Sequence, residues 1–307
     1  MSDYRKILVT GTQRSGTTWV GKILSAHRDY GYVHEPFNRV NHLIHDAPIE
    51  FPFQFVSESI DINSQKAYSE YLNYFLDPSW KFLYRSLKGV KYVDSRYISP
   101  LRQFKESKSS DNVKIIKDPF ALLSCEWLYS LGWEIIIVCR HPAAYALSML
   151  EKKWILTPRV FEEQSDEISH FYKDNEQYVH SYLKLKDRKS NLIESAIHAW
   201  NLHYCVIDYY RRKFPDWTFL YHEDLSKNPL SEFAKVFSNL GLDMDDSAVN
   251  QVKSTTEGSN LTGLKRNSSR NAQKWQSILS NEQVKNIKQG TSRLWPEFYG
   301  ETDWVYK

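Results

Sequence analysis

The stretch from Ile7 to Trp19 reads Ile-Leu-Val-Thr-Gly-Thr-Gln-Arg-Ser-Gly-Thr-Thr-Trp, and it decides the fold. A short β-branched run, Ile7–Thr10, leads directly into a loop bounded by Gly11 and Gly16 and then into a helical pattern. A glycine-bounded turn between a strand and a helix start exposes successive backbone N–H groups, and the helix dipole adds partial positive charge. The stretch therefore predicts a phosphate-binding loop at the end of a buried strand.

The spacing of the two glycines matches a Walker A loop, but the lysine of that loop is missing. Thr17 follows Gly16 at the position where a kinase or ATPase needs a lysine for its β- and γ-phosphates. The cation lies inside the loop instead, at Arg14. This pattern favours a nucleotide with a short 5′ end that needs no metal-bridged triphosphate. A P-loop nucleotide or small-molecule kinase remains the alternative.

The rest of the chain alternates strand-like and helix-like segments. The strand-like runs after the first one are Gly31–Val33, Val113–Ile116, Glu134–Cys139 and Trp217–Tyr221. Segments with helical spacing lie between them, at Thr18–Ala26, Phe120–Leu131, Ala143–Lys152 and Asn191–Lys213. This alternation predicts an α/β fold, a three-layer sandwich with a central parallel sheet of the P-loop NTPase type. Ligands of such sheets bind beyond the carboxyl ends of the strands.

No repeat or linker divides the sequence, so we expect a single domain over residues 1–307. Two segments, 38–112 and 153–190, break the alternation and are expected to form helical or irregular insertions over the acceptor site. A third segment, Ser254–Lys274, is polar and basic. It is either an exposed loop or a loop that becomes ordered over an anion.

Composition excludes several classes of protein. No apolar run approaches the roughly 18–20 residues of a membrane span, and the N-terminus lacks a signal-peptide core. The three cysteines have neither a disulfide nor a zinc spacing, so we expect a cytoplasmic protein without a metal. A net charge of +3 argues against a bulk nucleic-acid partner. A homodimer remains possible on this evidence.

A second anion site is predicted after the strand Glu134–Cys139. Arg140 follows the strand, and Pro142 marks the start of the next helix, because proline fits a first helical turn. A guanidinium beside the N–H groups of a helix start suits a second phosphate. Ser148 follows eight residues after Arg140. Two anion sites are what a 3′,5′-bisphosphorylated nucleotide requires.

The stretch Arg14–Trp19 resembles, at every position, the 5′-phosphosulfate loop of the cytosolic and bacterial sulfotransferases. These enzymes use 3′-phosphoadenosine-5′-phosphosulfate (PAPS) and release adenosine 3′,5′-bisphosphate. The resemblance implies that the 5′-phosphosulfate contacts Arg14, Ser15, Gly16, Thr17, Thr18 and Trp19. It also assigns Arg140 and Ser148 to the 3′-phosphate.

Further matches lie towards the C-terminus. Phe219–Leu225 looks like the family's strand and Tyr-Glu-Asp-Leu turn, although His222 stands where many members have a tyrosine. The contact with adenine is therefore left between Tyr221 and His222. The segment around Arg270 is similar to the family's cofactor-covering loop, which makes Arg270 a candidate phosphate ligand.

Sulfuryl transfer needs a base for the proton of the acceptor hydroxyl. His34 and Glu35 follow the second strand, and because strand neighbours point to opposite faces, we expect one of them to face the site. We choose Glu35, because the Glu-Pro-Phe pattern resembles glycan-, lipid- and tyrosine-modifying sulfotransferases that use a glutamate. Small-molecule sulfotransferases have Lys-x-His at the third strand, but Pro119 replaces that histidine here. Lys117 still matches and is expected to steady the transferring sulfonate.

Aromatic residues make up 15% of the chain, and many lie outside the cofactor framework. Most are expected to fill cores, but Trp80, Tyr84, Trp154 and Phe161 are candidates for lining an acceptor cleft. The acceptor is expected to be a sugar hydroxyl on a glycan, glycolipid or glycosylated metabolite, with a phenol, lipid or peptide tyrosine as alternatives. A non-catalytic binding protein of the same fold is a further alternative, which a Glu35 turned into the core would favour.

Overall fold

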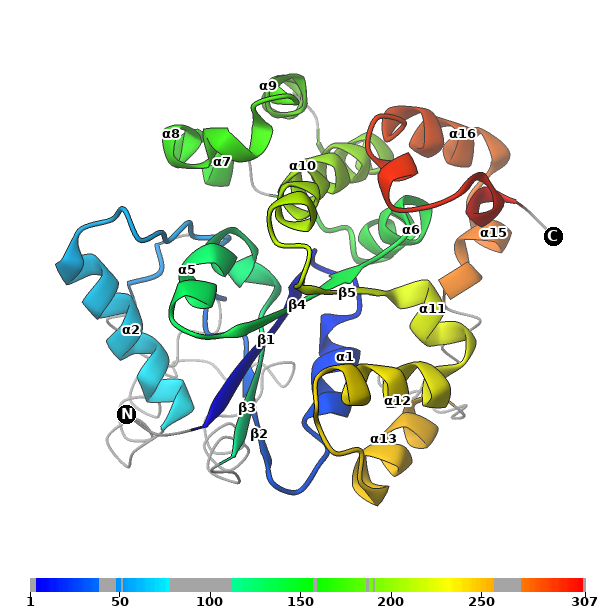
Figure 1. The fold of residues 1–307 in the computed structure, drawn as a ribbon. Helices are drawn as coiled ribbons and strands as arrows, with labels where there is room; N and C mark the ends of the chain where they lie inside the picture. Colours follow the sequence, from blue (N-terminus) through cyan, green and yellow to red (C-terminus); the bar gives the residue numbers. More distant parts are fainter. Residues whose placement is uncertain are drawn as a thin grey trace, which may run out of the picture. The chain divides into compact units, whose positions relative to one another are not determined.

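The β-branched runs of the sequence form the strands of one sheet in the computed structural model (Figure 1). β1 spans Arg5–Gly11, β2 Tyr30–His34, β3 Val113–Lys117, β4 Glu134–Cys139 and β5 Thr218–Tyr221. They follow the order β2-β3-β1-β4-β5, and both β1 and β2 run parallel to β3. This sheet, with its flanking helices, confirms the predicted α/β class.

The structure describes residues 4–38, 48–50, 52–77, 112–156, 159–185, 188–189, 191–256 and 272–305. Arg270, Trp80 and Tyr84 lie outside the described residues, as does most of the segment Ser254–Lys274. The roles expected of them stay predictions.

The chain divides into two compact units. Unit 1 consists of Met1–Gly11, Thr17–Ile136 and Ala234–Val252, and unit 2 of Thr12–Gly16, Ile137–Phe233 and Lys253–Lys307. The expectation of one domain over residues 1–307 stays a prediction.

Unit 1 is built on β1, β2 and β3. Ile7, Leu8 and Ile115 have no exposed surface, as expected for strands of a parallel sheet buried on both faces. Helix α1 (Thr17–Leu24) packs against all three strands. Gly21 allows this approach, because a Cβ atom there would lie 2.9 Å from Cβ of Lys117. The helix that follows the phosphate loop is therefore held against the strand that ends in Lys117.

The segment after β3 differs from its prediction in detail. In place of one helix over Phe120–Leu131, a 3₁₀ helix, η2 (Pro119–Ser124), precedes α5 (Cys125–Ser130). Asp118 caps η2, since its side chain accepts the N–H of Phe120 at 2.9 Å. Proline directly after the cap fixes the first turn. Within the first insertion, the described residues form α2 (Ile62–Leu76).

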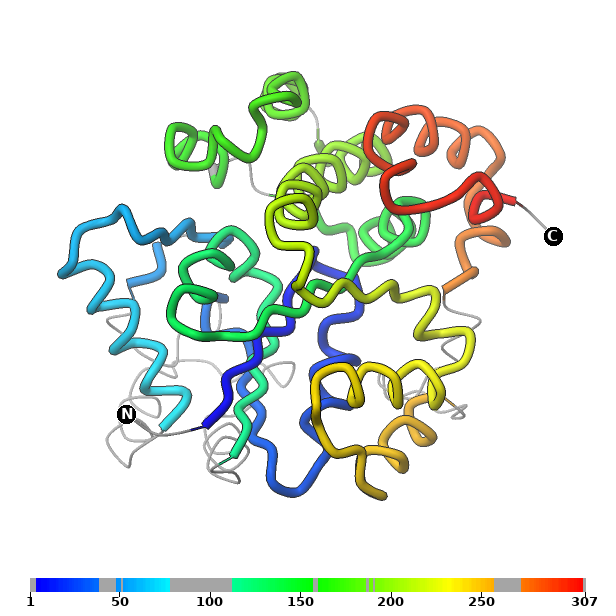
Figure 2. The backbone as a smooth tube through the Cα atoms, in the orientation of Figure 1, coloured from blue at the N-terminus to red at the C-terminus, as the bar shows by residue number. Residues whose placement is uncertain are grey.

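Unit 2 centres on the long helix α10 (Leu192–Lys213), which packs against α6 (Pro142–Lys152) and α16 (Asn281–Gly290) (Figures 1 and 2). The ring of Trp200 stacks on Tyr204 at a centroid distance of 3.7 Å. These contacts bury the helix face that carries both aromatic residues. Burial of one such side chain stabilises the fold by about 1.5–3 kcal/mol.

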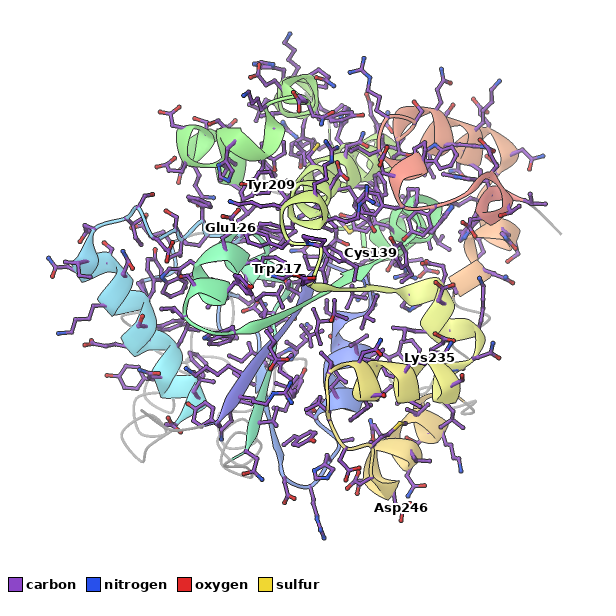
Figure 3. The ribbon with its side chains drawn as sticks, viewed as in Figure 1. Glu126, Cys139, Tyr209, Trp217, Lys235 and Asp246 are labelled. Atoms are coloured by element: carbon purple, nitrogen blue, oxygen red, sulfur yellow. The ribbon has the colours of Figure 1, made fainter. Side chains whose placement is uncertain are left out.

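A second aromatic cluster joins the end of α10 to β5 (Figure 3). The ring centroids of Tyr209 and Tyr210 lie 5.7 Å apart, and those of Tyr210 and Trp217 lie 5.1 Å apart. The rings of Phe214 and Trp217 stack at 4.3 Å. In this part of the chain the aromatic excess fills a core, as expected for most of these residues.

The remaining helices are short. Those of the second insertion are α7 (Arg159–Glu163), α8 (Ser165–Ile168), η3 (Ser169–Tyr172) and α9 (Glu176–Lys184). This insertion is helical as expected. One side of it is buried, because η3 and α9 pack on α10. The C-terminal elements are α11 (His222–Lys227), α12 (Pro229–Asn239), α13 (Asp246–Thr256), α15 (Trp275–Ile278), η4 (Trp295–Glu297) and η5 (Glu301–Trp304).

Candidate functional site: a cationic loop and a paired carboxylate

The loop after β1 curls tightly. The N–H and the hydroxyl of Ser15 both donate to the carbonyl oxygen of Thr12, at 3.2 and 2.8 Å. Arg14 and Gly16 have φ angles of 67° and 105°, in the left-handed region that favours glycine. The loop therefore holds a non-glycine residue, Arg14, in an unfavourable backbone conformation, a feature that is concentrated at binding sites.

Gly16 packs directly against His222 in unit 2. A Cβ atom on Gly16 would lie 2.5 Å from Cδ2 of His222, so no other residue fits there. Burial, with a contribution from the charge of Arg140, lowers the pKa of His222 to about 3. The imidazole is thus neutral at physiological pH and supports the loop.

Arg140 is fixed through its main chain. The hydroxyl of Tyr204 accepts its N–H at 2.6 Å, and the indole N–H of Trp200 donates to its carbonyl oxygen at 3.1 Å. The Nη1 atom of its guanidinium donates to the carbonyl oxygen of Arg14, while Nε is buried and has no partner among the described residues. Burial, together with the charge of Arg14, lowers the pKa of Arg140. This corner of unit 2 carries positive charge that an anion would stabilise.

Arg14 links the residues that the sequence assigns to two different phosphates. Its Nε donates to Oγ of Ser148 at 2.9 Å, and its carbonyl oxygen receives Arg140. The guanidinium also lies over the ring of Trp154, 5.4 Å from the centroid. The three predicted residues are thus brought together in unit 2, with Arg14 between the other two.

Glu223 is a member of this cluster that sequence reasoning missed. Its Oε1 accepts the N–H of His141 at 3.0 Å, and its Oε2 is buried without a partner in the described part of the chain. Burial raises the pKa of Glu223 to about 7, while Arg140 acts in the opposite direction. Its contact with the start of α6, where a carboxylate is stabilising, is a tertiary contact made from α11, and sequence spacing does not reveal it.

The other predicted residues of the loop begin α1 in unit 1. Thr17 is buried, whereas Thr18 and Trp19 are half-buried. The first N–H groups of a helix have no intrahelical partners, so these residues supply backbone donors. In unit 2, Tyr221 is half-buried, with its ring 5.7 Å from that of Tyr299.

A second cluster lies in unit 1 around Glu35, where β2 and β3 end. His34 is the β-register partner of Lys117, and the N–H of Glu35 donates to the carbonyl oxygen of Lys117 at 2.8 Å. The ammonium of Lys117 pairs with Oε1 of Glu35, and the side-chain N–H of Asn38 donates to Oε2 at 2.6 Å. The side chain of Glu35 keeps 13% of its surface exposed, so Glu35 is not turned into the core.

The pKa of Glu35 reflects opposing influences. Burial would raise it, but Lys117 and His34 lower it electrostatically, and the hydrogen bonds from Lys117 and Asn38 act in the same direction. The outcome is a pKa below the ordinary value. Glu35 is therefore a carboxylate at neutral pH, the form required of a base.

Strand alternation does not separate His34 from Glu35. Nε2 of His34 lies 3.8 Å from Oε1 of Glu35, so both side chains serve the same cluster. The physical reason is that β2 ends at His34, and Glu35 has a φ angle of 49°. The alternation rule applies to extended backbone and fails at this turn.

Asp118, which directly follows Lys117, holds this turn in place. It has no exposed surface, and it accepts the N–H groups of Phe37 at 2.5 Å and Phe120 at 2.9 Å. Burial and the nearby charge of Glu35 raise its pKa to about 8. Asp118 therefore forms the turn before Pro119 and adds a contact to the segment after Glu35.

Among the described residues, no group of three or more His, Cys, Asp or Glu side chains is arranged to hold a metal ion. Within the same residues, no helix is long and apolar enough to cross a membrane.

Residues 4–301 match the model of the sulfotransferase domain. The chain belongs to the sulfotransferase family. It is thus an enzyme of sulfuryl transfer. No curated protein sequence matches the chain significantly.

Three solved sulfotransferase structures are similar to the chain, and the first of them agrees with this assignment at the level of the fold. The sulfotransferase domain from the Synechococcus PCC 7002 olefin synthase is 16% identical, with a TM-score of 0.50, over 98% of this chain and 97% of that one. The sulfotransferase domain from the curacin biosynthetic pathway is 16% identical, with a TM-score of 0.44, over 95% of this chain and 98% of that one. Sulfotransferase STF1 from Mycobacterium tuberculosis H37Rv is 14% identical, with a TM-score of 0.41, over 95% of this chain and 77% of that one.

Proposed function

We propose that this sulfotransferase moves the sulfuryl group of PAPS to an acceptor hydroxyl, with a sugar hydroxyl on a glycan, glycolipid or glycosylated metabolite as the acceptor class. The observation that supports PAPS as the donor is the environment of the Arg140 guanidinium. Its guanidinium is tied to the phosphate loop, and its buried Nε has no partner among the described residues. A buried donor without a partner costs about 1–3 kcal/mol, which a phosphate oxygen would recover.

The phosphate loop fits an anionic nucleotide. Besides Nε of Arg140, the hydroxyl of Thr12 is buried and without a partner in the described chain. When bound, the nucleotide would supply the sulfuryl group and leave as adenosine 3′,5′-bisphosphate.

Each part of the nucleotide would have its own residues. Ser148 and Arg140 would take the 3′-phosphate, and the half-buried Tyr221 or the buried His222 would contact adenine. Arg270 would add a further phosphate contact. The residues that would hold the 5′-phosphosulfate are Arg14, Ser15, Gly16, Thr17, Thr18 and Trp19.

Glu35 would act as the base. It would accept the proton of the acceptor hydroxyl, while Lys117 and Arg14 would neutralise the charge that develops on the bridging oxygen. The pairing of Lys117 with Glu35 bears on this step, because Lys117 lowers the pKa of Glu35. If Lys117 turned from Glu35 towards the transferring group, the pKa of Glu35 would rise and the carboxylate would become a stronger base.

The part of the proposal that concerns the acceptor is supported by Trp154. This ring is 46% exposed beside Arg14, and an exposed aromatic face suits the C–H surface of a sugar. Phe161, by contrast, is 3% exposed and packs on Tyr172 and Tyr182, so it belongs to the core of unit 2. The absence of a metal and of a nucleic-acid partner, a homodimer and a cytoplasmic location stay predictions from the sequence.

The test is transfer of labelled sulfate from PAPS to a panel of glycan, glycolipid, phenolic, lipid and peptide acceptors without added metal. We expect labelled product with sugar acceptors, and none from the matched Glu35→Gln protein. Labelling of phenolic acceptors alone would show that the acceptor is a phenol and not a sugar hydroxyl. Transfer of phosphate from ATP with Mg²⁺, and none of sulfate, would overturn the proposal.

A further inference from the structure

Three groups converge on the carboxylate of Glu35, and one of them has no role in the proposed reaction. Lys117 donates to Oε1 and supplies charge, and Asn38 donates to Oε2 within the local turn. His34 lies with Nε2 at 3.8 Å from Oε1 and keeps 20% of its side-chain surface exposed. Its distance is too long for a hydrogen bond and short enough for strong electrostatic coupling.

The imidazole of His34 is fixed from its other side. The hydroxyl of Tyr32 lies 3.0 Å from Nδ1 of His34, and the two residues share one face of β2 as neighbours at i and i+2. Tyr32 is itself immobilised, since it is 3% exposed and Nζ of Lys22 lies 3.6 Å from its ring centroid. One ring nitrogen therefore meets a fixed hydroxyl, and the other faces Glu35.

We propose that His34 is a positioning residue for Glu35, which it orients from β2 and whose strength as a base it sets through its own charge. The inference rests on the proposed role of Glu35. In the step concerned, the O–H bond of the acceptor breaks and its proton passes to the carboxylate of Glu35. The electron pair left on oxygen forms the bond to sulfur, while the bond from sulfur to the bridging oxygen breaks towards the phosphate. His34 exchanges no atom in this step.

The sign of the effect follows from electrostatics. An imidazolium lowers the pKa of Glu35, as Lys117 does, and therefore weakens the base. Once the imidazole has lost its proton, this effect disappears and Glu35 accepts the proton of the acceptor more readily. The rate of turnover should therefore rise as the pH passes upward through the titration of His34.

Other charged and titratable groups around this cluster are Lys117 and Asp118 from the end of β3, Tyr32 on β2 and Lys22 on α1. Burial raises the pKa of Asp118 to about 8, so this carboxyl is largely neutral while a histidine titrates.

The first test is an NMR titration of the histidines in the wild-type and Glu35→Gln proteins. Loss of the carboxylate removes its attraction for the imidazolium, so the midpoint of His34 should move to lower pH. His27 is the matched control, because its 10% exposed side chain lies 3.6 Å from Asp243 instead. Its titration should be the same in both proteins. An unchanged midpoint for His34 would overturn the proposal.

The second test is the pH dependence of labelled-sulfate release from PAPS, with water as the acceptor. His34→Gln carries no titrating charge, so it should remove the rising limb of the rate and leave binding of adenosine 3′,5′-bisphosphate unchanged. Tyr32→Phe keeps the histidine and should keep the limb at a reduced rate. A wild-type limb in His34→Gln contradicts the proposal. Wild-type rates in Glu35→Gln would instead remove the proposed base, an outcome separate from the NMR result.

Discussion

Unit 1 surrounds the carboxylate of Glu35 with a lysine, an asparagine and a histidine, whereas unit 2 holds the guanidinium of Arg140 against the loop of a second arginine. In the first cluster each charge meets its opposite. In the second, two guanidinium groups lie together, and the buried Glu223 acts on Arg140 electrostatically.

The difference indicates a division of labour. A carboxylate held among hydrogen-bond donors is suited to gaining and losing a proton, while two adjacent guanidinium groups are suited to binding an anion. Variants in unit 1 should therefore change the rate of transfer, and variants in unit 2 should change the affinity for the nucleotide.

Glu35→Gln should have the largest effect. An amide of nearly the same shape cannot accept the proton, so turnover should fall about 10²–10⁴-fold. Binding of adenosine 3′,5′-bisphosphate, measured by calorimetry, should stay within about twofold of wild type. Retained turnover would place the base elsewhere, and lost binding would remove the distinction between the clusters.

Arg140→Ala should act on affinity. Loss of charge-assisted hydrogen bonds worth about 1.5–3 kcal/mol should weaken binding of adenosine 3′,5′-bisphosphate about 10–100-fold. Arg211→Lys is the matched control, because Arg211 is also in unit 2 but pairs with Asp208 and Glu297. Equal affinity of Arg140→Ala and wild type would show that the phosphate binds elsewhere.

The strands of the sheet could be predicted from the sequence, whereas the two charge clusters could be predicted only in part. Ile7–Thr10 and Glu134–Cys139 are local patterns, and they form β1 and β4 as expected. The proximity of His34 to Glu35 depends on a left-handed turn, which a strand pattern does not reveal. The link from Ser148 to Arg14 depends on where α6 packs, and sequence spacing does not determine that.

The two buried acids should give the protein a distinctive pH dependence of stability. Burial raises the pKa of Asp118 to about 8 and that of Glu223 to about 7, above the ordinary values near 4. Buried histidines such as His222, whose pKa is lowered to about 3, act in the opposite direction below the ordinary histidine pKa of about 6.5. Above that pH the two acids dominate and the native protein binds more protons than the unfolded chain, so stability should fall as the pH rises from about 6.5 to about 8. Urea unfolding at pH 6.5 and pH 8.5 measures the difference, and greater stability at pH 8.5 would contradict it.

The same acids should respond differently to amide substitution. Oε2 of Glu223 has no partner in the described chain, so Glu223→Gln should leave stability at pH 5 nearly unchanged and flatten its pH dependence. Both oxygens of Asp118 accept backbone N–H groups, so Asp118→Asn places a donor against a donor. That variant should lose about 1–3 kcal/mol in urea unfolding. Equal losses in the two variants would remove this contrast.

Trp154→Ala should have the smallest effect on affinity. The ring lies over the guanidinium of Arg14, and such a contact at an exposed site contributes about 0.5–1 kcal/mol. Binding of adenosine 3′,5′-bisphosphate should weaken about two- to fivefold. A rise in the acceptor KM beyond this factor would support a role for Trp154 in acceptor binding, and no change in either constant would exclude both roles.

The central claim is that the cationic loop of unit 2 binds a bisphosphorylated adenosine without a metal ion. Calorimetric titration of the wild-type protein with adenosine 3′,5′-bisphosphate and, separately, with ATP tests it directly, in buffer containing a chelator. We expect tight binding of the bisphosphate and little or none of ATP. The titrations are repeated with Mg²⁺ in place of the chelator. Binding of ATP with Mg²⁺, and no measurable binding of the bisphosphate with or without Mg²⁺, would contradict metal-free binding of a bisphosphorylated adenosine.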